Sequence, residues 1–465
     1  MQFALDNVKS RRDIFKATVG GFGYLAFAGM AEQTSGKSSG PLVPKSPHHR
    51  AKAKRVIFLC MQGGPSHVDT FDYKPKLHAD NGKEGRRNKS RLLASPWKFH
   101  QYGESGQWIS DLFPNVARLA DDICFLRGMK AKTGNHQQAH IQLHTGSAQF
   151  VRPSMGAWVL YGLGTECQNL PGFVCISPPP SFSFGGAQNY GSAFLPAVYQ
   201  GTRIADPLNA RIPQINNKRL SPSVQRRHLD LVRSMNRAIL ERENVNDHDV
   251  AVEGLINSFE LGFRMQRTVP QLMNLADEPE HVLRLYGIGD EPTEQFGRQC
   301  LYARRLAEQG VRFIELTHNN WDQHGNLVKG HADHCRSTDK PIAALLTDLK
   351  LRGLLDDTLV IWGGEFGRTP DALLEVDGSV KDGRDHNPDG FTFWMAGGGV
   401  RPGFSYGSTD EHGYEVVEGK IGIHDLHATI LHLLGLDHER LTFRYSGRDF
   451  RLTDVHGEVV DGFIA

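Results

Sequence analysis

The sequence predicts an α/β fold in which a mostly parallel sheet lies between layers of helices. Two observations support this prediction: apolar runs of strand length alternate with helical patterns, and polar clusters follow several of those runs. A length of 465 residues fits two or three domains, or one large α/β domain. With 39% hydrophobic and 23% charged residues, the chain has the composition of a soluble globular protein.

The N-terminal segment has the pattern of an export signal. "SRRDIFK" at residues 10–16 precedes a weakly apolar stretch at 17–31, which is too short and too rich in glycine to span a bilayer stably. A twin arginine before such a stretch resembles a Tat-type signal, and the polar linker at 32–53 supports this interpretation. We therefore expect a signal segment at 1–31, a folded domain at 54–465, and a periplasmic or secreted protein. The alternative is an ordinary amphipathic N-terminal helix.

The first half of the folded domain predicts strands that lead into loops and helices. A buried strand is predicted at 54–62, where the apolar run ends before paired glycines. Residues 112–129 predict a helix and then a strand. Helices are predicted at 135–147, ending at Gly146, and at 154–164. The strand-like run "GFVCIS" follows, in a region rich in Pro, Ser and Gly.

The second half begins with helices and then returns to strands. Residues 218–310 are charged and helical in pattern, and 225–285 is predicted to be a helical insertion. The remaining predicted elements are strands at 311–317, 359–362 and 390–396, and helices at 337–358 and 425–436. In a sheet of this kind the functional site lies beyond the carboxyl ends of the strands.

Charge and cysteine usage exclude several classes of protein. Lys and Arg total 53 against 52 acidic residues, which gives no indication of a nucleic-acid or anionic-membrane partner. The six cysteines contain no C-x-x-C pair, so a zinc ribbon or thioredoxin motif is excluded. Cys167 and Cys175 are close enough in sequence to form a disulfide, although free buried thiols are the simpler interpretation.

Polar clusters adjoin four of the predicted strands. If these strands are parallel neighbours, the clusters converge at one edge of the sheet. Carboxylate and imidazole groups together suit Zn²⁺ or Mn²⁺, whereas oxygen-only sets suit Mg²⁺ or Ca²⁺. Two such ions can clamp the attacking and leaving oxygens of a sulfate or phosphate ester. The clusters contain Ser66, His67, Asp69 and Asp72; His318, Asp322 and His324; Glu365 and Arg368; and Asp385 and His386.

Each cluster also has a structural interpretation. Asp69 can cap the helix that follows it. Asp322 and His324 can form a hydrogen-bonded turn. Glu365 and Arg368 can form a structural ion pair. The functional interpretation is favoured because the clusters recur at the ends of several strands.

Several motifs together resemble a known family. They are "MQGGPSHVDTFDYKP", "HQQAHIQLHTGS", "WDQHGN", "WGGEFGRTP", "GRDHNPDGFTFWMAGGG" and "TILHLLGL", and the resemblance covers most of residues 52–455. The chain resembles the domain of unknown function 1501 family, a sulfatase-like branch of the alkaline phosphatase superfamily. This resemblance implies an alkaline phosphatase-like core with a dimetal site at the strand ends.

The resemblance also implies metal ligands. Asp322, His324 and His386 occupy the places of the ligands of one ion, although the spacing between the first two is shorter than usual. For a second ion, Glu365 stands where an Asp-His pair begins. Gln62 stands in place of the usual aspartate at the end of the first strand, and Asp69 is the candidate to replace it.

The expected nucleophile is absent. The superfamily places Ser, Thr or Cys nine residues before a Thr-Gly, and this chain has His136 there. No Cys lies in the C-x-P-x-R context required for formylglycine, so a standard sulfatase mechanism is not expected. His136 is a candidate nucleophile, metal ligand or general base. His140 and His144 share its helical face, and we expect them to be packing residues.

Other residues are candidates for the nucleophile or for substrate contacts. Thr133 and Ser66 offer hydroxyl groups as nucleophiles, ranked after His136. Arg368 and Lys74 can neutralise charge on the substrate, with Ser66 and His67 beside them.

Two functional hypotheses follow. The first is an exported hydrolase of small-molecule or glycan sulfate or phosphate esters, which uses one or two divalent metal ions. The second is a degenerate relative that binds carbohydrate or an envelope partner without catalysis, since the usual nucleophile and one aspartate are replaced. A phosphomutase-like transferase is less consistent with export.

Overall fold

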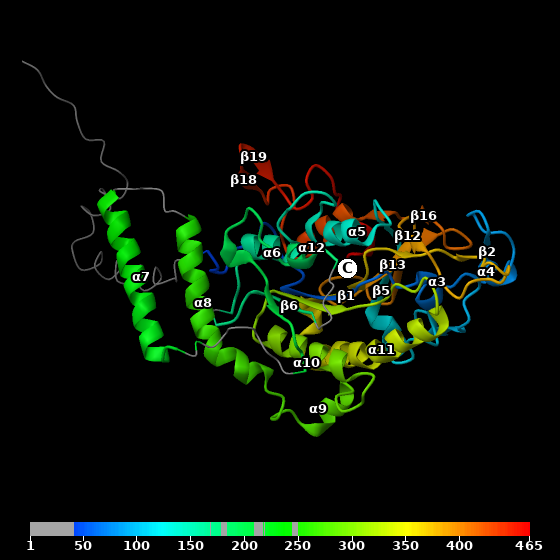
Figure 1. Cartoon of the computed structure of the whole chain (residues 1–465), viewed down its shortest axis with the longest axis horizontal. Coiled ribbons are helices and arrows are strands. Elements are labelled where there is room, and N and C mark those ends of the chain that lie inside the picture. The colour runs from blue at the N-terminus through cyan, green and yellow to red at the C-terminus, as the bar shows by residue number, and fades with distance from the viewer. Residues whose placement is uncertain (1–40, 168, 178–183, 209–216, 218, 244–249) are drawn as a thin grey trace, which may run out of the picture.

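The computed structural model describes residues 41–465, except 168, 178–183, 209–216, 218 and 244–249. Its centre is a nine-stranded sheet with the order β14-β5-β13-β9-β1-β8-β6-β7, and β17 pairs with β5. Helices cover both faces of this sheet (Figure 1). The predicted α/β class is therefore confirmed. The predicted signal segment at 1–31 and the first part of the linker lie outside the described residues.

Most neighbouring strands of the sheet are parallel. β1 pairs in parallel with both β8 and β9, β6 pairs in parallel with β8 and β7, and β5 does so with β14 and β17. Only β13 runs against its two neighbours in the sheet, β5 and β9. The strands are β1 (Arg55–Met61), β5 (Ile123–Lys130), β6 (Phe173–Ile176), β7 (Thr202–Ile204), β8 (Phe313–His318), β9 (Thr358–Gly363), β13 (Phe391–Ala396), β14 (Phe404–Tyr406) and β17 (Ile421–Gly422).

The apolar strands are buried on both faces because each face packs against helices. In β1, Ile57, Leu59 and Met61 belong to one core cluster, whereas Val56, Phe58 and Cys60 belong to the other. Figure 1 shows α5 (His136–Thr145), α6 (Met155–Leu163) and α12 (Ile423–Leu433) above the sheet. It shows α10 (Glu294–Glu308) and α11 (Leu327–Leu351) below it.

Helix α11 begins ten residues earlier than the predicted helix at 337–358 and also ends earlier. Its first turns look polar in sequence, but Leu327, His331 and Cys335 recur every four residues and are buried. The helix ends at Leu351 because Gly353 adopts a positive φ of 66° two residues later.

The region predicted as an insertion contains α7 (Pro222–Glu243), α8 (Val250–Met273) and α9 (Glu280–Leu285). Figure 1 shows α7 beside α8 at one end of the molecule. The last turns of α8 join the main core through Met265, Val269 and Leu272. The helices of this region are present, but the assignment of residues 225–285 as an insertion stays a prediction.

The remaining elements are short and lie in the connections. One pair, β10 (Gly367–Arg368) with β12 (His386–Asn387), carries residues of the predicted site. No described helix is both long and apolar enough to cross a membrane. The others are α3 (His67–Thr70), α4 (Pro75–Ala79), β2 (Ser90–Leu92), β3 (Phe99–Tyr102), β4 (Gln107–Ser110), β11 (Asp371–Leu373), β15 (Ser408–Thr409), β16 (Val416–Glu418), β18 (Phe443–Tyr445), β19 (Arg448–Phe450) and the 3₁₀ helices at Val116–Asp122, Gly186–Asn189, Ala197–Tyr199, Leu355–Asp357 and Asp461–Phe463.

Candidate metal centre

Strand direction brings the predicted ligands to one edge of the sheet. Asp322 and His324 follow β8, and Glu365 follows the parallel strand β9. His386 precedes β13, but β13 runs antiparallel to β9, so its beginning lies at the same edge. His136 is the first residue of α5, which follows the carboxyl end of β5. The predicted ligands therefore converge at this edge, although β13 runs antiparallel to the other strands.

Asp322 is the centre of the cluster. Its Oδ1 lies 3.0 Å from Nε2 of His324 and 3.3 Å from Nε2 of His386, and its Oδ2 lies 3.2 Å from Nε2 of His136. One donor atom from each of these four residues lies within 4.8 Å of the others. The Asp322 side chain is 36% exposed, so the cluster is open to solvent.

The two histidines on the open side direct their Nε2 atoms at each other. Nδ1 of His386 lies 2.6 Å from the carbonyl oxygen of Gly134, which can only accept a hydrogen bond. Nδ1 therefore carries the proton and leaves a lone pair on Nε2, 2.8 Å from Nε2 of His324. Two imidazole nitrogens and a carboxylate oxygen that face the same point can bind a cation or share a proton.

His136 is held by Glu365 on its other side. Nδ1 of His136 lies 2.6 Å from Oε1 of Glu365, a fully buried carboxylate that also accepts from the amide of Gly63 at 3.1 Å. Burial opposes ionisation of Glu365, but the hydrogen bond with His136 and the nearby imidazole of His140 hold its pKa well below the ordinary value. Burial also lowers the pKa of His136, but Asp322 and Glu365 outweigh it and raise this pKa to about 8.

The position of His136 is fixed by the start of its helix. The side chain of Asn135 accepts a hydrogen bond from the amide of Gln138 at 3.1 Å and so caps α5. At the other end, Gly146 adopts a φ of 74°, which ends the helix as the sequence predicted. Thr133, the alternative nucleophile, accepts a hydrogen bond from the Asn135 amide in the turn before the helix.

Arg368 is placed differently from its predicted role. Its side chain is 1% exposed, and its guanidinium donates to the carbonyl oxygens of Gly63, Gly64 and Arg384. It also donates to Oδ1 of Asp322 at 2.5 Å. The structure supports the ion-pair interpretation, but with Asp322 rather than Glu365 as the partner. Arg368 therefore ties the loop after β1 to Asp322.

The predicted residues in the loop after β1 lie outside the cluster. Asp69 is buried and pairs with Nε of Arg384 at 2.7 Å, while Ser66 donates to the same carboxylate at 2.5 Å. His67 contacts the carbonyl oxygen of Gly413, and Lys74 pairs with Asp72 at 3.0 Å. Within the described ranges, no hydrogen bond or ion pair joins Asp69, Ser66, His67 or Lys74 to the Asp322 cluster.

The sequence interpretation did not identify a second polar group under α5. His140 and His144, expected to pack, lie among Cys60 and Glu315, and His144 Nε2 is 3.1 Å from Oε1 of Glu315. All six cysteines are free thiols. One feature of the sequence could have indicated this group. Glu315 interrupts the apolar run of β8, and a buried carboxylate requires a partner.

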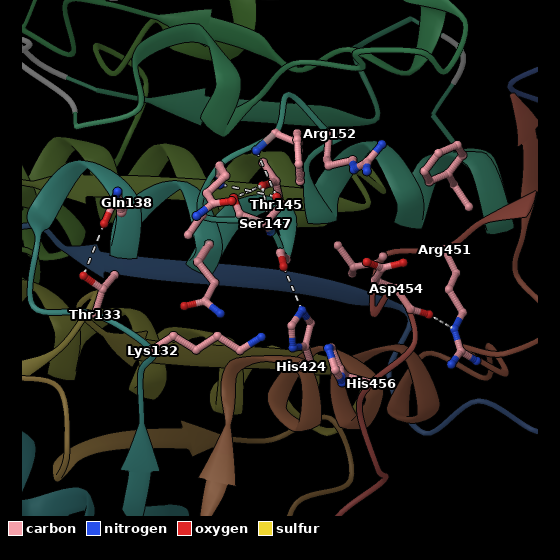
Figure 2. Close-up of a pocket in the computed structure, with 17 residues that line it drawn as sticks. Lys132, Thr133, Gln138, Thr145, Ser147, Arg152, His424, Arg451, Asp454 and His456 are labelled. Atoms are coloured by element: carbon pink, nitrogen blue, oxygen red, sulfur yellow. Dashed lines mark hydrogen bonds between the residues drawn. The ribbon is translucent and has the colours of Figure 1, made fainter. Parts of the chain in front are cut away.

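A pocket opens on the opposite flank of α5 (Figure 2). It has a volume of about 540 Å³ and is lined by Gln138, Gln142 and Thr145 from α5, with Lys132 and His424 nearby. These helical positions lie on average roughly 165° around the helix from His136, His140 and His144, since each residue advances by about 100°. The pocket is therefore separated from the metal centre by the helix.

The donor set fits a divalent cation of the Zn²⁺ or Mn²⁺ type. It combines a carboxylate with three imidazoles, and the unprotonated Nε2 of His386 faces the shared point. Gln62, at the end of β1, is also buried, and its side-chain oxygen and nitrogen have no hydrogen-bond partner within the described part of the chain. An unpartnered amide at this place fits a further ligand or a bound water.

The fold and the cluster define an α/β protein with metal-type ligands at the carboxyl edge of a parallel sheet. Residues 53–464 match the model of the family described as "Protein of unknown function (DUF1501)", and the chain belongs to this family. The predicted resemblance is thereby confirmed. No curated protein matches the chain significantly.

Several solved structures have a similar arrangement of elements. The lipoteichoic acid synthase of Listeria monocytogenes is 11% identical, with 88% of this chain and 78% of that chain covered and a TM-score of 0.40. A Pseudoalteromonas sulfatase is 12% identical (90% and 72% covered, TM-score 0.34), and TAB5 alkaline phosphatase with bound Mg is 13% identical (83% and 99%, TM-score 0.36). At these values the similarities are too weak to carry an argument about activity.

Proposed function

We propose that the chain is a metal-dependent hydrolase of sulfate or phosphate esters. The observation that carries this proposal is the set of four donor atoms from Asp322, His324, His386 and His136 within 4.8 Å at the edge of the sheet. Such a set gathers a carboxylate and three imidazoles around one point, which is an arrangement that binds a divalent cation. The open side of Asp322 leaves room for a small-molecule or glycan ester.

In this proposal the residues of the centre have separate roles. Asp322, His324 and His386 hold the cation, which when bound polarises the ester oxygen and stabilises developing negative charge. Glu365 accepts a hydrogen bond from Nδ1 of His136 and thereby directs Nε2 towards Asp322 and the substrate, and Nε2 becomes the base once it has lost its proton. Glu365 is therefore a positioning residue, and Gly63 fixes it through the backbone amide.

His136 then acts as the general base. Its Nε2 removes a proton from the attacking water as the new bond to sulfur or phosphorus forms. The bond to the leaving alkoxide breaks, and the same proton is returned to that oxygen. The products are an alcohol and inorganic sulfate or phosphate. A direct attack by water needs neither a formylglycine nor a hydroxyl nucleophile.

Metal content and ester turnover test this function together. Purified protein is analysed for bound metals and assayed with p-nitrophenyl phosphate, bis(p-nitrophenyl) phosphate and p-nitrophenyl sulfate. In Asp322→Ala we expect loss of a bound ion and a fall in turnover of at least about 100-fold. Asp333→Ala is the matched control, because Asp333 lies on the nearby helix α11 and pairs only with exposed cations. Unchanged turnover in Asp322→Ala would refute the proposal.

One observation favours a second candidate function. The buried guanidinium of Arg368 lies 2.5 Å from Oδ1 of Asp322 and places a fixed positive charge beside the proposed cation site. If this charge replaces the cation, the centre is a degenerate one that binds carbohydrate or an envelope partner. Wild-type protein without metal and without turnover in the same assays would support this candidate.

We also propose that the chain is exported. The twin arginines Arg11 and Arg12 before a weak apolar stretch support this proposal. Cell fractionation of the full chain and of an Arg11→Lys/Arg12→Lys variant tests it. We expect the wild type outside the cytoplasm and the variant inside, and equal cytoplasmic retention of both would contradict export.

A further inference from the structure

A second group of metal-type side chains lies in the interior between α5 and the sheet. It consists of Cys60 from β1, Glu315 from β8, and His140 and His144 from α5. All four are buried, none being more than 2% exposed. One donor atom from each of Cys60, His140 and His144 lies within 4.8 Å of the others. The group is thus separate in composition from the solvent-exposed Asp322 centre.

His144 places its Nε2 against a carboxylate. Its Nδ1 lies 2.8 Å from the carbonyl oxygen of His140, so Nδ1 carries a proton. Its Nε2 lies 3.1 Å from Oε1 of Glu315. In the neutral imidazole both of these atoms carry lone pairs, and two lone pairs at this distance require a proton or a cation beside them. A backbone carbonyl behind the distal nitrogen is also the usual support of a metal-binding histidine.

His140 has buried nitrogens without a hydrogen-bond partner. Among the described residues, neither Nδ1 nor Nε2 has a hydrogen-bond partner, and the carboxylate of Glu365 is 3.8 Å from Nδ1. The side chain is 1% exposed, and its ring centroid lies 4.4 Å from that of His144. A buried imidazole nitrogen without a hydrogen-bond partner is unfavourable, so its presence in the core requires an explanation.

We propose that Cys60, His140, His144 and Glu315 bind a cation of the Zn²⁺ type inside the protein. Sulfur and imidazole nitrogen are donors that Zn²⁺ accepts and that Mg²⁺ and Ca²⁺ do not favour. Ligands of a tetrahedral zinc ion lie about 3.5 Å apart, so small side-chain rotations bring these donors into place. The Cys60 thiol releases its proton to solvent when the ion binds.

Charge balance supports a divalent ion in this place. A Cys60 thiolate and the Glu315 carboxylate carry two negative charges, and the histidines are neutral ligands. One divalent cation makes the set neutral, which removes the main penalty for burying its charges. The ion would also fix α5 against the sheet and so position His136, which starts the same helix face.

Cobalt spectroscopy tests the proposal without reference to activity. The full chain is produced in medium with Co²⁺ in place of Zn²⁺, because a buried site fills most readily as the chain folds. A cobalt–thiolate charge-transfer band in the near ultraviolet reports sulfur ligation, and the Asp322 centre contains no sulfur. We expect the band in the wild type and in Asp322→Ala, and its loss in Cys60→Ser.

Two further variants complete the test. Cys175→Ser is the matched control, because Cys175 is another buried thiol, 3.8 Å from Oε1 of Glu315. It should keep the band. His140→Gln should lose one equivalent of cobalt with an unchanged circular dichroism spectrum, which keeps the test decisive if Cys60→Ser fails to fold. The proposal would be overturned if the wild type lacked the band or if the band survived in Cys60→Ser. It would also be overturned if the cobalt content of His140→Gln were unchanged.

Discussion

The loop after β1 and the loop after β8 carry the same kinds of side chain and use them in different ways. Asp69 in the first loop is buried, and both of its oxygens are paired with Arg384. Asp322 in the second loop is one-third exposed and faces three imidazoles. The difference separates donors that face one another, which mark a candidate ligand site, from donors that are fully matched by a buried partner, which hold the fold.

The same contrast holds for two histidines. His331 is buried beside the first loop, where its Nε2 accepts from the Ser66 amide at 3.3 Å and its Nδ1 contacts Gln323 at 3.0 Å. Burial lowers its pKa to about 3. The pKa of His136 is instead raised to about 8, because its carboxylate partners outweigh its burial. One imidazole is therefore held neutral, whereas the other is prepared to bind a proton or a cation.

The largest expected effect is that of Asp69→Asn. The substitution leaves the buried guanidinium of Arg384 without its counter-charge, which should lower the free energy of unfolding by about 3–5 kcal/mol. Urea unfolding measures the change. Lys329→Ala, which breaks an exposed ion pair, is the control and should have no measurable effect. A loss below about 1 kcal/mol in Asp69→Asn would contradict a structural role.

The same substitution at Asp322 should cost less stability. In metal-free protein Asp322→Asn should lower the free energy of unfolding by about 1–2 kcal/mol, since Asp322 is partly solvated and the charges of Glu365 and Asp385 remain near Arg368. The variant should nevertheless lose metal binding. Urea unfolding in the presence of chelator gives the comparison. A loss as large as that of Asp69→Asn would remove the distinction between the two loops.

His331, which lies on α11 beside the first loop, should contribute to the loss of stability at acid pH. The pKa of His331 is lower in the folded protein than the unfolded value of about 6.5, so the unfolded state binds the extra proton. Stability therefore falls as pH drops below about 6.5, by up to about 1.4 kcal/mol per pH unit. His331→Asn should make this fall shallower, whereas His281→Asn, at an exposed position, should not.

The smallest expected effect is a change in one pKa. Replacing Glu365 by Gln removes a charge 2.6 Å from Nδ1 of His136, so the pKa of His136 in metal-free protein should fall by about one unit. NMR titration of the imidazole measures it. The raised pKa in the wild type stabilises the fold fully below about 6.5, and this contribution is lost as pH rises through about 8. An unchanged pKa in Glu365→Gln would show that Glu365 does not hold the proton of His136.

Much of the fold and part of the centre could be predicted from the sequence. The strand at Arg55–Met61 and the helix that ends at Gly146 follow from local apolar patterns and a glycine stop. Asp322 and His386 were identified because polar residues beside strands point to the edge of a sheet. Asp69 and Lys74 matched the same rule, but a rule based on position along the chain cannot tell whether a buried partner occupies them.

The sequence by itself determined the α/β class, the family and the residues that reach the carboxyl edge, because periodicity and strand ends are local properties of the chain. Only the tertiary structure decided that β13 runs antiparallel and still delivers His386 to the cluster. It also decided that Arg384 neutralises Asp69, and that Cys60 and Glu315 meet two histidines under α5. Pairing between residues hundreds of positions apart depends on strand order and register, and these are set by the packing of the whole sheet.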